Sequence, residues 1–160
     1  MLYIACMYAY LLPLHSLFRW LVLLGLVVGL ISSYRGWLGQ KAYTALDNGI
    51  RHWSATIAHV QLVLGLWLYF VSPLTNHFIH HFSEDVHDRQ IRFFGMEHSI
   101  MMIVGIVIMT VASMMAKRQK TDTGKFRVLG IGYTIALLVI LSSIPWPFSP
   151  MVSRPYIRLI

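Results

Sequence analysis

Charged residues are scarce in this chain. Asp, Glu, Lys and Arg make up 12% of the 160 residues, whereas 57% of the residues are hydrophobic. A soluble domain is about a quarter charged, so the deficit indicates that lipid surrounds most of the surface. Cysteine is scarcer still, because Cys6 is the single one, and this excludes an internal disulfide.

Four apolar stretches account for most of the sequence. They cover residues 14–34, 53–72, 93–116 and 128–146. Each has about 20 residues, which is enough to cross a hydrocarbon core of ~30 Å as a helix. No other stretch is long enough for a separate globular domain, so the sequence predicts an all-α, integral membrane four-helix bundle in one domain over 1–160.

The last three stretches have no Gly-rich phosphate loop and no paired carboxylates, and no serine or cysteine has an evident base, so hydrolytic chemistry has no support.

The formal charge of +7 is unevenly distributed. The connections 35–51 and 117–127 are basic, with Arg35, Lys41, Arg51, Lys117, Arg118, Lys120, Lys125 and Arg127 against Asp47 and Asp122. The other side has Arg89, Arg92, Arg154 and Arg158, offset by Glu84, Asp85 and Asp88. The positive-inside rule therefore predicts both basic connections in the cytoplasm of a bacterial inner membrane and both termini outside. The basic excess indicates contact with anionic lipid headgroups and no nucleic-acid partner.

Three histidines lie within or at the ends of the apolar stretches: His15, His59 and His98. An ionisable residue inside a membrane is a functional candidate, and a neutral imidazole is a common ligand of metals and of haem iron. With a rise of ~1.5 Å per residue, His15 and His98 lie at similar depths on the outer side of the midplane. His59 is ~16–18 Å from His98 in depth by the same rise, so the predicted axial pair is His15 and His98.

Neighbouring residues suggest further roles. Arg19 is four residues after His15, hence on the same helix face, where it could pair with a haem propionate or extend towards water. Glu97, next to His98, could pair with Arg92 or Arg19 or orient a ligand. For His59 the open readings are helix packing, haem ligation, a hydrogen bond to a quinone, and proton relay.

A histidine-rich segment, residues 76–88, separates the second and third apolar stretches. It offers a second candidate metal site from His77, His80, His81, Glu84 and His87. In a helix, His77, His81, Glu84 and Asp88 would share one face, and His80, Glu84 and His87 another. Imidazole with carboxylate suits zinc, copper, nickel or iron. The spacing matches no named zinc motif, and a solvated polar loop is the favoured interpretation.

Several short segments carry a family resemblance: HSLFRW at 15–20, DN at 47–48, HVQLVLG at 59–65, EH at 97–98 and IPWPF at 144–148. They resemble small bacterial four-helix membrane proteins labelled cytochrome b. The layout is also loosely similar to cytochrome b561-type proteins and to one half of haem A synthase. The likeness covers roughly residues 10–150, and it implies haem b held by histidines from among His15, His59 and His98. The fourth helix has no histidine, unlike the haem A synthase half.

The predicted function is therefore that of a haem b-binding membrane subunit. It would pass electrons between a quinol or cytochrome partner and an acceptor, alongside other membrane subunits of a respiratory assembly, as a redox subunit more than a complete enzyme. Two alternatives remain open. One is a cofactor-free accessory subunit whose polar groups only join helices, and the other is a metal carrier that uses the histidine-rich segment.

Overall fold

The computed structural model describes residues 2–149 and 152–156, and these form helices and turns without a strand. Four helical segments in this part are long and apolar enough to cross a membrane: Cys6–Leu38, Ala45–Val71, Arg89–Arg118 and Asp122–Ser143. The predicted all-α, four-helix membrane fold is confirmed. Arg158, one of the charges assigned to the outer side, lies outside the described residues.

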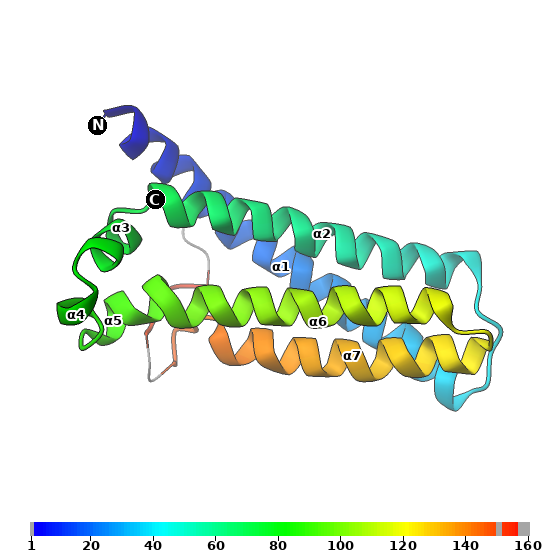
Figure 1. Ribbon diagram of the computed structural model, residues 1–160. Helices are drawn as coiled ribbons and strands as arrows, with labels where there is room; N and C mark the ends of the chain where they lie inside the picture. The colour runs from blue at the N-terminus through cyan, green and yellow to red at the C-terminus, as the bar shows by residue number, and fades with distance from the viewer. Residues whose placement is uncertain (1, 150–151, 157–160) are drawn as a thin grey trace.

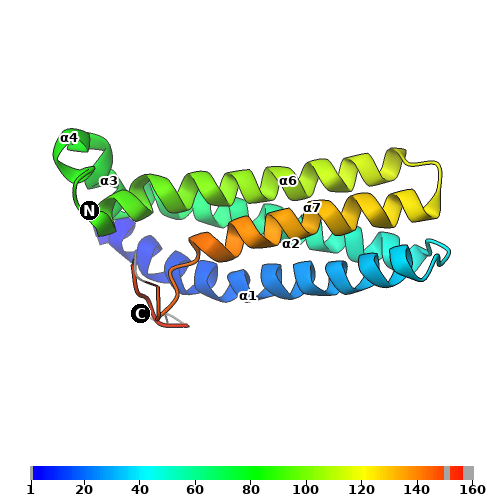
Figure 2. The same ribbon diagram turned by 90° about the horizontal axis from the view of Figure 1, so that it is seen from below.

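The long helices pack side by side as a bundle (Figure 1). They are α1 (Leu2–Leu38), α2 (Ala45–Val71), α6 (His98–Arg118) and α7 (Asp122–Ser143). Helix α1 contacts α2 and α7, and α6 contacts the same two helices, so the four form a closed ring. Between α2 and α6 lie α3 (Pro73–His80), α4 (Phe82–Asp85), α5 (Arg89–Arg92) and the π-helical turn η1 (Phe93–Glu97). These short elements, the start of α1 and the segment 152–156 gather at one end of the bundle (Figures 1 and 2).

Helices α1, α2 and α7 begin earlier than the apolar pattern predicts, and in α2 and α7 the reason is a polar cap. Helix α2 begins at Ala45 instead of 53, because Thr44 and Asp47 form a reciprocal capping box in which each side chain accepts a hydrogen bond from the other's backbone N–H. Helix α7 begins at Asp122 instead of 128, and the Thr121 hydroxyl accepts a hydrogen bond of 3.1 Å from the Gly124 backbone. In both α2 and α7, the polar residues just before the apolar run form the first helical turns.

Helix α1 continues without a break through Pro13. Residues 2–13 therefore extend the first helix beyond its predicted start at residue 14. At ~1.5 Å per residue, the 37 residues of α1 are longer than a ~30 Å hydrocarbon core requires. The first turns of α1 therefore lie beside the short helices at the same end of the bundle.

The centre of the bundle is apolar and tightly packed. Leu26, Met109 and Ala136 have no exposed surface, and each comes from a different helix. Large apolar side chains also cover the outside, as Leu24 and Phe70 do at 60% and 71% exposure. An outer surface of this kind is suited to lipid, and the described helices thus contact lipid on the outside and one another on the inside.

A buried polar network joins the helices at the opposite end of the bundle. The Arg51 guanidinium donates to the side-chain amide oxygen of Asn48 at 2.9 and 3.1 Å and to the Ser113 hydroxyl at 2.6 Å. The Ser32 hydroxyl donates to Asp47 at 2.6 Å. Since buried polar groups are stable only when hydrogen-bonded, this network fixes how α1, α2 and α6 meet.

Candidate cofactor site

A cavity of about 200 Å³ opens between α1, α2 and α6 at the end of the bundle that carries the short helices. One buried water needs ~10–15 Å³ by a comparable measure, so the cavity has room for a sizeable ligand. Its lining is largely apolar but includes four basic residues, His15, Arg19, His98 and Arg154. None of the described lining residues is acidic, so the cavity favours an anionic ligand or one with anionic groups.

His15 and His98 face each other across this cavity. Their ring centroids are 6.4 Å apart and the ring planes are inclined by 76°. For comparison, two imidazole nitrogens each ~2 Å from one metal are ~4 Å apart, and with ~1.1 Å from each nitrogen to its ring centre the two ring centres lie ~6.2 Å apart. The structure therefore brings together the two histidines that were predicted to lie at the same depth. The distance between their ring centres is compatible with both binding one iron.

Helix α2 holds the His15 ring closely. The Gln61 amide donates to the His15 backbone carbonyl at 3.0 Å, and the same nitrogen lies 3.3 Å from His15 Nε2. His15 Nδ1 is buried and has no hydrogen-bond partner. One turn further along α2, Gly65 leaves room for the ring, because a Cβ there would lie 3.0 Å from His15 Cε1. Buried polar atoms are normally hydrogen-bonded, so an unpaired ring nitrogen beside a cavity is consistent with a ligand-binding site.

The backbone around His98 sets the orientation of its ring. Nδ1 of His98 donates to the carbonyl oxygen of Ser143 at 2.7 Å, which leaves Nε2 as the nitrogen with a lone pair. A carbonyl partner of this kind typically orients a metal-bound histidine. The π-helical turn η1 ends at His98, whose N–H donates to the Phe93 carbonyl. Such turns occur frequently at functional sites.

Arg19 lies at the edge of the cavity, one turn after His15. Its guanidinium donates to the backbone carbonyl of Tyr156, and Trp20 Nε1 donates to the same oxygen at 3.2 Å. The Nε of Arg19 is buried without a partner. The segment 152–156 thus folds back onto the bundle and brings Arg154 to the cavity wall, where its guanidinium lies 5.2 Å from the centre of the Phe94 ring.

His59 and Glu97 take up other positions. His59 Nε2 is 2.9 Å from the Thr110 hydroxyl, which itself donates to a backbone carbonyl of α6. His59 is exposed on the outside of the bundle and is not among the cavity-lining residues, so its described contact is the packing contact between α2 and α6. Of the two pairings considered for Glu97, the structure has the one with Arg92, at 2.7 Å.

The histidine-rich segment, favoured above as a solvated loop, folds into α3 and α4. This is a correction to the sequence prediction. The structure brings together His77, His81 and Asp85 as a group of possible ligands. His80, Glu84 and His87 from the predicted set do not belong to that group, and Asp85, which does, was not in the set. His77, His81 and Asp85 are successively four residues apart, so helical spacing was the available signal, but the sequence prediction assigned Glu84 and Asp88 to this face instead.

Sequence reasoning also missed parts of the cavity wall. Gln61 and Gly65 are four residues apart, hence on one face of α2, and they belong to the segment that carries the resemblance. Their common face could have indicated that both residues line the cavity. Nothing in the sequence indicated this for Arg154, because it reaches the cavity only through the fold-back of segment 152–156.

Comparisons with other proteins are uninformative for this chain: no family model, no curated protein and no solved structure matches it.

Proposed function

We propose that this protein is a haem b-binding membrane subunit that carries electrons within a respiratory assembly of the bacterial inner membrane. The observation that supports this best is the pair of imidazoles 6.4 Å apart in a cavity between transmembrane helices. Histidine in the apolar part of a helix is costly, and two that meet at one cavity are readily explained by a shared ligand.

In this proposal, the residues around the two histidines orient the ligands and balance the charge of the haem. His98 would present Nε2 because Ser143 holds Nδ1, and His15 would approach from α1 with its ring supported by Gly65. Arg19 and Arg154 would balance the two propionate charges, which arginine does well through paired hydrogen bonds. Haem b, when bound, would supply one-electron chemistry. The chain would contribute ligation, burial and charge balance, and a quinol or cytochrome partner would supply electrons.

The arrangement also argues against a purely structural role for these histidines. A histidine that only joins helices can hydrogen-bond across the interface, as His59 Nε2 does with the Thr110 hydroxyl at 2.9 Å. His15 instead keeps Nδ1 buried and without a partner beside a cavity. An unsatisfied buried polar group destabilises a fold by about 1–3 kcal/mol, so a ligand that engages the ring would recover this energy.

An absorption spectrum of the purified full chain, before and after reduction with dithionite, tests the proposal. We expect a low-spin haem b spectrum in the wild type and its loss in both His15→Ala and His98→Ala. His59→Ala is the matched control, because it also removes an imidazole from a transmembrane helix, and it should keep the spectrum. Arg19→Leu should weaken haem retention more than Arg19→Lys, which keeps the charge.

Two results would overturn the proposal. A protein that stays colourless when haem is supplied during expression would favour the cofactor-free accessory subunit. Loss of haem in His59→Ala together with its retention in His15→Ala would show that the iron lies nearer the bilayer centre, on a different pair of ligands.

A further inference from the structure

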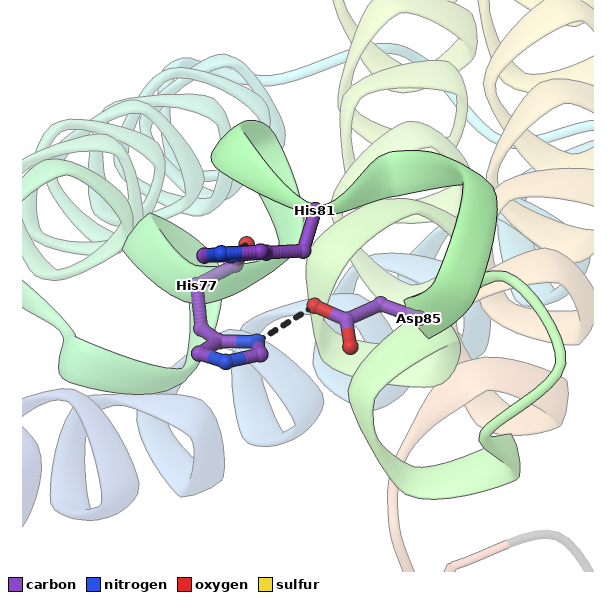
Figure 3. Close-up of side chains that lie close together, drawn as sticks. All are labelled: His77, His81 and Asp85. Atoms are coloured by element: carbon purple, nitrogen blue, oxygen red, sulfur yellow. Dashed lines mark hydrogen bonds and ion pairs between the residues drawn. The ribbon is translucent and has the colours of Figure 1, made fainter.

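We propose that His77, His81 and Asp85 bind one divalent transition-metal ion of the class that prefers imidazole and carboxylate ligands, with Zn²⁺ as the representative. The three residues lie at the corner between α3 and α4, outside the cavity described above (Figure 3). This site does not depend on haem, and the two proposals can fail separately.

The geometry of the three side chains is close to that of a metal site. One ligand atom from each residue lies within 4.8 Å of those of the other two. In a tetrahedral zinc site with bonds of ~2.0–2.2 Å, neighbouring ligand atoms are ~3.4 Å apart. His77 and His81 are exposed, so small rotations of their side chains would bring the three atoms to this spacing without moving the backbone.

The two imidazoles are already arranged in parallel. Their ring centroids are 4.3 Å apart and the planes are inclined by 22°, with the Asp85 carboxylate beside the His77 ring (Figure 3). His81 Nδ1 lies 3.3 Å from the carbonyl oxygen of His77, to which it donates, so that Nε2 keeps its lone pair.

Asp85 provides a second, independent argument. Its side chain is 8% exposed, whereas that of His77 is 54% exposed, and His77 Nδ1 lies 2.6 Å from Asp85 Oδ2. A buried carboxylate is costly unless a positive charge compensates it. A divalent ion held by Asp85 and both histidines would supply that charge.

Packing of α3 against η1 fixes the backbone that carries His77 and His81. Phe78, between the two histidines in sequence, is buried, and the backbone of Gly95 in η1 lies close against it, since a Cβ there would be 2.4 Å from the Phe78 ring. Tyr69 donates from its hydroxyl to the Gly95 carbonyl at 2.8 Å. Metal sites need ligands whose backbone is fixed by packing. Here the packing of α3 against η1 provides this, and Thr75 of α3 lines the cavity on the other side.

Zinc binding by the purified full chain in detergent tests the proposal. We expect isothermal titration with ZnCl₂, and elemental analysis after dialysis, to give one ion per chain with a dissociation constant in the micromolar range or tighter. His77→Ala, His81→Ala and Asp85→Asn should each weaken binding by at least ~10–100-fold, the loss seen even for outer partners of metal ligands. Asp85→Asn keeps the size of the buried side chain, so a loss in this variant reports charge and ligation.

A double variant, His80→Ala with His87→Ala, is the matched control. It removes two exposed histidines of the same segment that lie outside the group, and it should bind zinc as the wild type does. Equal loss in the control would show diffuse binding by surface histidines and would overturn the assignment. Wild-type affinity retained in both His81→Ala and Asp85→Asn, or wild-type binding only at millimolar zinc, would show that His77 and Asp85 form an ion pair alone.

Discussion

Gly65→Ala tests how closely α2 approaches the His15 ring. A methyl group at this position would lie 3.0 Å from Cε1 and 3.5 Å from Nδ1 of His15. Favourable carbon contacts occur at ~3.5–4.0 Å, so the methyl group would overlap the ring by about 0.5 Å or more. Either the ring or one of the two helices must move.

Gly49→Ala is the matched control for this substitution. Gly49 lies on the same helix, and a Cβ there meets no heavy atom within 4 Å. Both substitutions relieve the cost of a glycine inside a helix, which is about 0.5–1 kcal/mol. Only Gly65→Ala adds overpacking, which costs about 1–3 kcal/mol. We therefore expect Gly49→Ala to be at least as stable as the wild type, and Gly65→Ala to be less stable than Gly49→Ala by about 1–3 kcal/mol.

Unfolding in mixed detergent micelles, followed by circular dichroism, measures this difference. The comparison does not require a cofactor, because it depends only on the contact between Gly65 and His15. Where haem is bound, the Gly65→Ala protein should also retain less of it, since a site tolerates displacements of only ~0.5 Å in its ligands. Equal free energies of unfolding for the two variants would refute the reasoning, because they would show that α2 does not pack against the His15 ring.

Two further predictions concern the membrane orientation and the buried network. In a Cys6→Ser background, single cysteines at Ser83 and Lys120 should react with an impermeant thiol reagent from opposite sides of intact cells, with Ser83 on the outside. Labelling of the Lys120 position from outside would reverse the orientation. A double-mutant cycle of Arg51→Leu and Ser113→Ala should give a coupling of about 0.6–1.7 kcal/mol, the range for hydrogen bonds between transmembrane helices. No measurable coupling would mean that the 2.6 Å contact contributes nothing to stability.

The composition and the apolar runs were enough to predict four membrane-crossing helices, because a helix that spans lipid must bury its own backbone polar groups over a known length. Helix ends were less well predicted. The polar residues of the Thr44–Asp47 capping box appear from the apolar pattern to lie outside the helix, whereas the structure places Asp47 in the first turn of α2. Caps use polar residues, so hydropathy alone places a capped end too late.

The sequence by itself determined depth along the bundle. A constant rise per residue put His15 and His98 at one level and His59 at another, and in the structure the first two meet across a cavity while His59 contacts Thr110. Only the tertiary structure decided how each helix is rotated about its axis and which segments distant in sequence lie next to the sites. Helix rise does not say which face of α2 turns towards His15, so Gln61 emerged only from packing. Similarly, Asp85 touches His77 only because the chain turns between α3 and α4, since residues eight apart in a straight helix are separated by ~12 Å along its axis.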